Sequence, residues 1–278
     1  MPGSADTARG GTVGGAVGGT GGGAADDLPA GMIVADGVSR SFGTFTAVCD
    51  VSFSLPAGRM VGLVGSDGAG KTTLLRMIAT MLPPDSGTVA VAGRDVVRER
   101  SAVKERIGYM PQRFGLYQDL TVAENLEFFM DIYGITGPER RRRRERYLGF
   151  SNLLPFTERR AGDLSGGMKQ KLGLACVLVH EPQVLILDEP TNGVDPVSRQ
   201  EFWRILSEMK GAGMTILVST AYLDEGERCD RLLLMHNGRI LSDAAPVEIQ
   251  AGFASLEEAM IERIRAVDAT LAEDAFGR

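Results

Sequence analysis

The sequence lacks any apolar run that could cross a bilayer. Its longest apolar stretches, such as residues 174–179 and 184–187, are far shorter than the ~18 to 20 residues that a membrane-spanning helix requires. Their length suits a buried strand or one face of a helix. The chain also does not begin with a charged segment followed by an apolar one, so we expect no secretory signal. If the protein serves a membrane, we expect it to do so from the cytoplasm through a partner.

Cysteine is scarce and its positions are isolated. Cys49, Cys176 and Cys229 form no CxxC pair. This spacing excludes a disulfide framework and a zinc site of the usual kind, and it is typical of proteins in a reducing cytoplasm.

Positive charge is also in short supply. The chain has 30 Lys and Arg against 36 Asp and Glu, a net charge of −6, so we expect nucleic acid not to be its main partner. Residues 140–144 are a run of five arginines flanked by Glu139 and Glu145. No set of aromatic residues for base stacking accompanies this run. It is better interpreted as a solvated helix face, with contact to anionic lipid headgroups as the alternative.

What is abundant at the start of the chain is glycine. Residues 1–30 are rich in Gly, Ala and Thr and lack large apolar side chains, so we predict a disordered tail, either dispensable or a functional tether. Residues 31–265 are predicted to form one domain, and residues 266–278 a C-terminal tail after a packing helix with Leu256, Met260, Ile261 and Ile264 on one side. The 44% hydrophobic content is sufficient for its core.

Within the domain, strand-like and helix-like segments alternate, which predicts an α/β fold with a mainly parallel sheet covered on both faces. Expected strands cover residues 32–40, 51–55, 60–65, 88–93, 107–111, 184–190, 214–220 and 231–238. Expected helices cover residues 72–82, 196–210 and 221–229, and another begins near Ser165. The first should end at Pro83, because proline cannot continue a helix. Helical patterns at 121–154 interrupt the alternation and predict an inserted helical subdomain at about 113–165.

A glycine-rich loop follows the expected strand at 60–65 and precedes a helix. It matches the phosphate-loop pattern GxxxxGK[ST] in the strand–loop–helix context that supports this motif. Glycines allow backbone N–H groups to surround phosphate oxygens, and the helix dipole adds positive potential. Lys71 is predicted to bind the β- and γ-phosphates, and Thr72 to ligate Mg²⁺. The nucleotide-binding residues predicted here are Gly65, Ser66, Asp67, Gly68, Ala69, Gly70, Lys71, Thr72 and Thr73.

Two acidic residues end another buried strand. The segment VLILDEP places Asp188 and Glu189 directly after residues 184–187. Parallel strands end at the same edge of a sheet, so these carboxylates should lie near the phosphate loop. We predict that Asp188 holds the Mg²⁺ shell and that Glu189 is the general base that polarises the attacking water.

The segment LSGGMKQ at residues 164–170 decides the family, because it is similar to the signature of ABC ATPases. Ser165 can cap the helix that follows, leaving N–H groups directed outward. With Gly166 and Gly167, this helix start suits a γ-phosphate presented by a second molecule.

The remaining motifs also resemble this family, from residue 32 to about 265. The segments that carry the resemblance are IGYMPQRFGLY, LTVAENL, LSGGMKQKLGLA and DEPTNGVDP. They are similar to the corresponding segments of the ATP-binding subunits of ABC-2-type bacterial exporters. The resemblance implies a P-loop NTPase core with an antiparallel β subdomain at its N-terminal side. It also implies that Gln112 reaches Mg²⁺ and the attacking water, that Phe42 stacks on adenine, and that Asp195 lies in a loop crossing between two domains.

The same resemblance implies the cofactors and the partners. ATP and Mg²⁺ bind between two ABC ATPase domains, from the same or a different chain, each phosphate loop facing the other domain's LSGG. The expected partner is a membrane permease of the ABC-2 type, with the chain peripheral on the inner face of the cell membrane. Two alternatives stay open: a soluble ATP-gated ABC protein, and a chain that binds ATP without turning it over.

One position departs from the family pattern. ABC ATPases carry a histidine in a segment like STHxxxE, whereas this chain reads STAYLDE with Ala221 in its place. Loss of such a γ-phosphate donor typically lowers the rate ~10²- to 10³-fold, which predicts an impaired site, either in a slow homodimer or beside an intact site in a heterodimer. Neither His180 nor His236 is an obvious replacement, and both are predicted to be surface turn residues. Asp67 stands where many relatives have asparagine, and its charge should weaken nucleotide binding.

Overall fold

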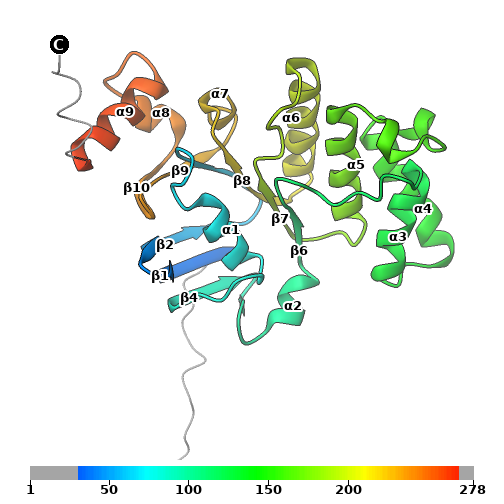
Figure 1. The fold of residues 1–278 in the computed structure, drawn as a ribbon, viewed down its shortest axis with the longest axis horizontal. Helices are drawn as coiled ribbons and strands as arrows, with labels where there is room; N and C mark the ends of the chain where they lie inside the picture. The colour runs from blue at the N-terminus through cyan, green and yellow to red at the C-terminus, as the bar shows by residue number, and fades with distance from the viewer. Residues whose placement is uncertain (1–30, 269–278) are drawn as a thin grey trace, which may run out of the picture.

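The computed structural model describes residues 31–268 and contains two β-sheets (Figure 1). The predicted tail at 1–30 and the end of the C-terminal tail lie outside the described residues. The first sheet is antiparallel with strand order β2-β1-β4-β5, and the second has order β10-β9-β3-β8-β7-β6. Strands β9, β3, β8, β7 and β6 run parallel, and β10 is antiparallel to β9. The predicted fold class is therefore confirmed.

The strand bounds are as follows. The first sheet comprises β1 (Ile33–Phe42), β2 (Phe45–Leu55), β4 (Ser86–Val91) and β5 (Arg94–Asp95). The second comprises β3 (Met60–Val64), β6 (Ile107–Met110), β7 (Val184–Asp188), β8 (Thr215–Thr220), β9 (Arg231–His236) and β10 (Arg239–Ala244).

The helices surround the second sheet and extend beyond it at both ends (Figure 1). They are α1 (Lys71–Ile78), α2 (Arg100–Lys104), α3 (Val122–Ile132), α4 (Gly137–Phe150), α5 (Gly166–Leu178), α6 (Pro196–Gly211), α7 (Leu223–Gly226), α8 (Pro246–Gln250) and α9 (Leu256–Val267). Helices α3 and α4 lie within residues 113–165 at one end of the molecule, and α8 and α9 lie at the other end.

The core lies on both faces of the second sheet. In β7, Leu185 and Leu187 belong to the apolar cluster that includes α5 and α6. Val184 and Ile186 belong to the cluster that includes α1 and the first sheet. Side chains alternate between the faces of a strand, so a strand that is apolar at every position is covered on both sides. Burial of both faces therefore holds the end of β7 rigidly in place.

Two helices are shorter than the sequence predicts. The helix expected at 72–82 ends at Ile78, because Thr80 has a left-handed φ of 63° and the N–H groups of Met81 and Leu82 both donate to the Arg76 carbonyl oxygen. A local backbone turn thus ends the helix before the prolines do. The helix expected at 221–229 is the single turn α7.

The C-terminal helix packs with a narrower face than its spacing predicts. Leu256, Ala259 and Met260 are buried, whereas Ile261 is 42% exposed. The prediction that Ile261 lies on the packed side was therefore wrong.

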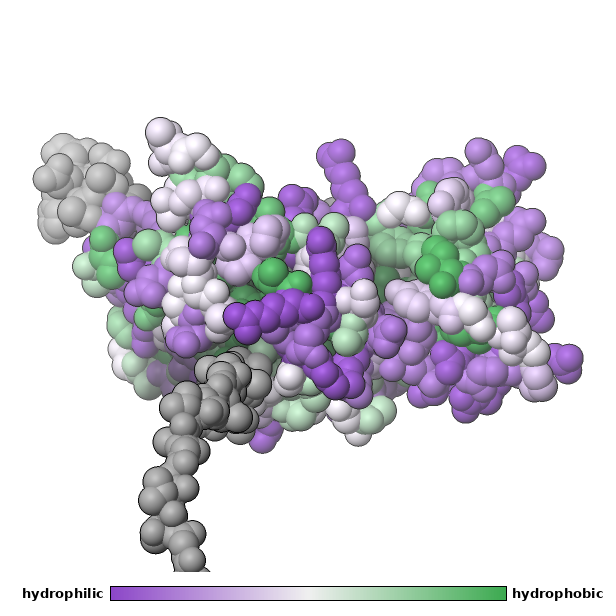
Figure 2. Space-filling model, turned by 90° about the horizontal axis from the view of Figure 1, so that it is seen from below, coloured by the Kyte–Doolittle hydropathy of each residue, from purple (hydrophilic) through white to green (hydrophobic). Residues whose placement is uncertain are grey.

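Hydrophilic residues cover most of the face seen in Figure 2. Hydrophobic residues form separate patches, one of them at the end of the molecule that holds α3 and α4. Between residues 31 and 268, no helix combines the length and the apolar character that a membrane span requires.

Candidate active site

The phosphate loop connects β3 to α1, and two of its glycines are required by close backbone contacts. A Cβ on Gly65 would lie 2.1 Å from the Met235 carbonyl oxygen, and one on Gly70 would lie 2.2 Å from that of Ala47. Gly70 also has a φ of 105°, a conformation that side chains disfavour. Gly70 precedes α1 and provides no side-chain cap, so the N–H groups of the first turn are directed into the cleft as donors for an anion.

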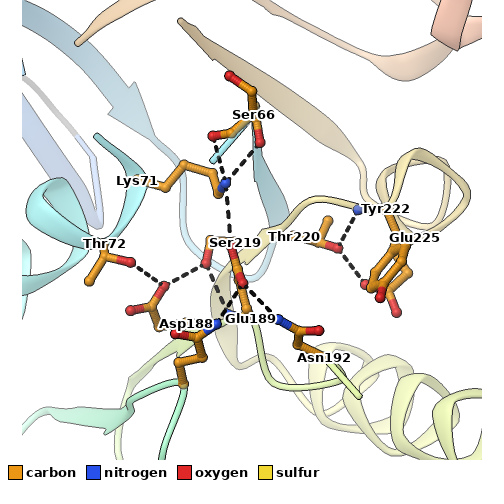
Figure 3. Close-up of polar contacts among 12 residues, drawn as sticks. Ser66, Lys71, Thr72, Asp188, Glu189, Asn192, Ser219, Thr220, Tyr222 and Glu225 are labelled. Carbon is orange, nitrogen blue, oxygen red and sulfur yellow. Dashed lines mark hydrogen bonds and ion pairs between the residues drawn. The ribbon is translucent and has the colours of Figure 1, made fainter. Parts of the chain in front are cut away.

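Lys71 lies across the mouth of this loop with only 5% of its surface exposed. Its Nζ donates to the carbonyl oxygens of Gly65 (2.8 Å) and Ser66 (3.1 Å). It also lies 3.3 Å from Oε1 of Glu189 (Figure 3). The ammonium group is therefore placed where the loop donors converge, close to the predicted general base.

Asp188 ends β7 and is almost completely buried. Its Oδ1 accepts hydrogen bonds from the hydroxyl groups of Thr72 (3.1 Å) and Ser219 (2.9 Å). Burial raises the pKa of Asp188, the two hydroxyl groups oppose that shift, and the neighbouring Glu189 adds to it. A cation at this carboxylate would favour its ionised form.

Glu189 has a strained backbone conformation and several hydrogen-bond partners. Its φ is 47°, a left-handed value that is uncommon for a residue with a side chain. Its backbone N–H donates to the Ser219 Oγ (3.0 Å), and its Oε2 accepts from the amides of Gln112 (3.0 Å) and Asn192 (3.3 Å). The carboxylate is thus held between the strand ends and the following turn (Figure 3).

Most of the predicted site residues line one cleft, whereas Gly65, Ser66 and Asp188 lie behind or beside its lining. Its lining residues are Phe45, Ala47, Asp67, Gly68, Ala69, Gly70, Lys71, Thr72, Thr73, Gln112, Glu189 and Asn192. Sequence analysis did not select Asn192 or Phe45. Asn192 could have been selected because it lies three residues after Glu189. In a tight turn, a side chain at that spacing can reach back and contact the Glu189 carboxylate.

A more apolar hollow lies between α4 and the C-terminal end of α6, lined in part by Tyr147, Phe150, Met209 and Met214. None of the predicted site residues lines it, so it is not the candidate active site.

Phe42 does not belong to the residues that line the cleft. It is 48% exposed at the end of β1, and the Arg40 guanidinium lies 5.1 Å from its ring centre. Arg40 is in turn paired with Asp85 at 2.5 Å. One face of the Phe42 ring is therefore supported by a fixed cation, and Phe45 is the second exposed aromatic residue beside the loop.

The residues predicted to meet a second domain lie outside this cleft. Ser165 caps α5 by accepting the Met168 N–H at 3.3 Å, with Gly166 and Gly167 in the first turn. Asp195 caps α6 by accepting the Ser198 N–H at 3.0 Å, a bond that lowers the pKa of Asp195. Ser165, Gly166 and Asp195 are exposed. Within one chain, the phosphate loop is not brought to the LSGG segment.

Ala221 follows β8 beside a small cavity. The cavity is lined by Asp67, Glu189, Thr191, Asn192, Thr220, Ala221 and Tyr222. A longer side chain at position 221 would thus have space to approach Glu189.

The two histidines lie elsewhere and are more covered than predicted. His180 is half-buried and stacks on Tyr133 with ring centres 4.0 Å apart, and burial lowers its pKa. The side chain of His236 is 11% exposed and lies 3.2 Å from Asp268. The prediction that both are surface turn residues was wrong for His236, which ends β9 and is largely covered. His180 does lie in a turn, after α5, but it is half-buried against Tyr133.

Comparisons with known proteins agree on one family. The family described as ABC transporter matches residues 48–192. The probable multidrug ABC transporter ATP-binding protein YbhF of Escherichia coli (strain K12) is 52% identical over 217 residues, which cover 77% of this chain and 38% of that protein. The chain therefore spans about two fifths of the length of that relative.

A second relative is covered over most of its length. The Nod factor export ATP-binding protein I of Paraburkholderia xenovorans (strain LB400) is 40% identical over 220 residues, covering 79% of this chain and 72% of that protein. Among solved structures, an ATP-binding subunit of an ABC transporter has a TM-score of 0.75 and 30% identity, covering 84% of this chain and 99% of that one.

Proposed function

The chain belongs to the ABC transporter family, and from this premise we propose that it is the ATP-binding and ATP-hydrolysing motor subunit of an exporter. The observation that carries the proposal is the convergence of Lys71, Gln112 and Glu189 at one cleft. These residues come from three segments far apart in the sequence. A cation for phosphate, a carboxylate base and an amide that orients water are the groups that phosphoryl transfer to water requires.

Each group has a task when ATP occupies the cleft. The free N–H groups at the start of α1 and the Lys71 ammonium bind the phosphates. Glu189 accepts a proton from the attacking water, and Gln112 holds the carboxylate and that water in position. Three existing bonds to its carboxylate, from Lys71, Gln112 and Asn192, keep the base oriented.

The donors near Thr72 fit Mg²⁺. This ion prefers oxygen ligands and binds through one or two carboxylates together with substrate phosphates. The Thr72 hydroxyl and the Asp188 carboxylate provide two adjacent oxygens at 3.1 Å, and the Gln112 amide is the third candidate ligand. When bound, the ion would neutralise charge on the phosphates.

A second ABC ATPase domain completes the site in this proposal. The LSGG helix start is exposed and does not line the chain's own cleft, which supports a head-to-tail pair in which it binds the partner's γ-phosphate. The motif wording favours an ABC-2-type permease as the membrane partner, and with it a location on the inner face of the cell membrane. The names of the relatives, which concern multidrug and Nod factor export, support export.

The alanine at position 221 favours an asymmetric pair. Its methyl group cannot donate to a γ-phosphate, so this chain's own site would be slow while its LSGG completes the partner's site. The alternatives are a slow homodimer and a chain that only binds ATP. The bonds that orient Glu189 argue against binding alone, since a carboxylate held for proton transfer serves no purpose there.

Steady-state ATP turnover of the purified chain tests the proposal, with Lys71→Ala as the background. Turnover above that background is expected, and Ala221→His should raise it if the missing donor limits the rate. If turnover stays at background in both the wild type and Ala221→His, the proposal of hydrolysis by this chain alone fails. If the wild type is fast and Ala221→His adds nothing, the histidine is dispensable and a homodimer is the better interpretation.

A further inference from the structure

Glu225 is a buried carboxylate that ends the STAYLDE segment, and sequence analysis assigned this position no role. It lies in α7, one turn after β8, and only 1% of its surface is exposed. An unpaired carboxylate at this depth would be strongly destabilising, so its partners must offset the burial. They are two hydroxyl groups and one guanidinium group.

The three partners come from three elements around the active site. The Glu225 carboxylate accepts hydrogen bonds from Thr191 Oγ1 at 2.7 Å, Thr220 Oγ1 at 2.5 Å and Arg199 Nε at 3.0 Å. Thr191 belongs to the turn after Glu189, Thr220 ends β8, and Arg199 lies in the first turns of α6. One side chain thus connects the strand end, the turn and the helix.

Each of these elements also holds a residue of the site. Asn192, next to Thr191, donates to the Glu189 carboxylate at 3.3 Å. Ser219, next to Thr220, accepts the Glu189 N–H at 3.0 Å. Helix α6 begins at the cap Asp195, the residue predicted to face a second domain. Glu189 is therefore held from two sides by neighbours of the residues that Glu225 binds (Figure 3).

Thr220 also shapes the segment that carries Ala221. Its hydroxyl donates to Glu225 and accepts the Tyr222 N–H at 3.0 Å. The Tyr222 ring lies under Arg199, with its centre 4.3 Å from the guanidinium carbon. The position of Ala221 beside Glu189 thus depends on the same carboxylate.

We propose that Glu225 is a positioning residue for ATP hydrolysis: its carboxylate fixes the 189–195 turn relative to β8 and α6, and thereby the orientation of Glu189. This inference rests on the proposed function of the chain. A carboxylate accepts at both oxygens, so it binds all three donors. A glutamine accepts at one oxygen only: its amide N–H groups would face Arg199, which cannot accept, or a threonine hydroxyl, whose proton would then lose its acceptor. A small displacement of a reacting group is sufficient for a large loss of rate.

Glu225→Gln tests the inference, and Asp224→Asn is its matched control. Asp224 is the adjacent acid and also pairs with Arg199, at 3.3 Å, but its side chain is 69% exposed. Glu225→Gln is expected to lower kcat roughly 10- to 100-fold with the KM for ATP nearly unchanged, and Asp224→Asn to change neither. Equal kcat values for Glu225→Gln and the wild type would overturn the inference.

A second pair of variants separates positioning from general stability. Thr191→Val removes the hydroxyl that binds Glu225 while keeping the shape, and Thr191→Ser restores a hydroxyl. We expect kcat to fall in Thr191→Val and to recover in Thr191→Ser, with the melting temperature unchanged between them. Loss of kcat that follows the melting temperature across all variants would instead indicate a merely structural role.

Hydrogen exchange distinguishes failure of this inference from failure of the proposed function. Turnover at the Lys71→Ala background in both the wild type and Ala221→His would contradict the proposed function. The amides of residues 189–195 should still exchange faster in Glu225→Gln than in the wild type or Asp224→Asn. Unchanged exchange in this turn would overturn the role of Glu225 whatever the turnover.

Discussion

The strand edge that carries the active site and the helical subdomain both contain many charged side chains, but they use them differently. At the strand edge, Lys71, Asp188 and Glu189 are 5%, 1% and 12% exposed, and each has at least two polar partners. In α4, the arginines pair mostly with exposed acids. Those acids are Glu127, Asp131, Glu139 and Glu181, with side chains between 34% and 67% exposed.

This difference shows that the number of ion pairs is a poor measure of their importance. Exposed pairs typically contribute at most ~1 kcal/mol each, whereas oriented groups in a desolvated site can change a rate by orders of magnitude. The interpretation of residues 140–144 as a solvated face holds for Arg141 and Arg142, which are exposed. It is wrong for Arg143, which is 16% exposed and donates to the Val179 carbonyl oxygen at 2.6 Å.

The largest effect should come from one buried carboxylate at the strand edge. Glu189→Gln replaces the proton acceptor with a group that cannot accept a proton from water. We expect turnover to fall roughly 10²- to 10⁴-fold while ATP binding is retained, as measured by steady-state hydrolysis and by titration with a fluorescent ATP analogue. Glu139→Gln in α4 is the control. If the two variants lost turnover to a similar extent, the contrast between the strand edge and the helical subdomain would be contradicted.

The next effect concerns a position at which the helical subdomain resembles the strand edge, because it holds a buried polar side chain with several partners. Asn125 is fully buried; its Oδ1 accepts the Tyr117 N–H at 2.9 Å, and its amide donates to the carbonyl oxygens of Tyr117, Leu120 and Thr121. Asn125→Ala leaves these groups without their partner, so the free energy of unfolding should fall by about 2 to 3 kcal/mol. Urea denaturation measures this, with the exposed Gln200→Ala as control. The prediction would be contradicted if Asn125→Ala lowered the free energy of unfolding by less than the removal of one ion pair of α4.

A smaller effect is expected at the exposed margin of the site. Phe42→Ala should weaken ATP binding roughly 10-fold, because stacking of an aromatic ring on a base contributes about 1 to 3 kcal/mol and Arg40 already holds the Phe42 ring from one side. Phe45→Ala is the matched variant, since Phe45 lines the cleft and is 60% exposed. Isothermal titration with ATP compares them, and a larger loss in Phe45→Ala would assign adenine to Phe45.

The smallest effect concerns the exposed pairs of α4. Hydrogen bonds from Arg142 and then Arg143 lower the pKa of Glu139 from 4.5 to about 2. A lowered pKa means that the stabilisation is present above pH 4.5 and is lost as the pH falls toward 2. Glu139→Gln should therefore be slightly less stable than the wild type at pH 7, with the difference disappearing near pH 2.

Urea denaturation at pH 7 and at pH 2 measures this change. Glu145→Gln is the control, because Glu145 is an exposed acid on the same helix with no ion pair in the part of the chain that the structure describes. A pH dependence that is the same for Glu139→Gln and Glu145→Gln would contradict the role of the Glu139 pairs.

Much of the fold was predictable because it depends on local patterns. Apolar runs indicated the strands β3, β7 and β8, since strands buried on both faces are apolar along most of their length. The early end of α1 at Ile78 and the burial of His180 were not predictable. The first depends on a left-handed φ at Thr80, a conformation that is uncommon for a residue with a side chain. The second depends on Tyr133, which lies 47 positions away in the sequence.

The sequence by itself determined which chemical groups this protein carries. The phosphate loop, the acid pair after a strand and the LSGG helix start each consist of residues that are neighbours in the chain. Only the tertiary structure decided how these groups meet. Thr72 and Asp188 are 116 positions apart, Gln112 and Glu189 are 77 apart, and Thr191 and Glu225 are 34 apart. The physical reason is that local backbone preferences act over a few residues, whereas the distance between two buried side chains is set by the packing of the sheet on which both are carried.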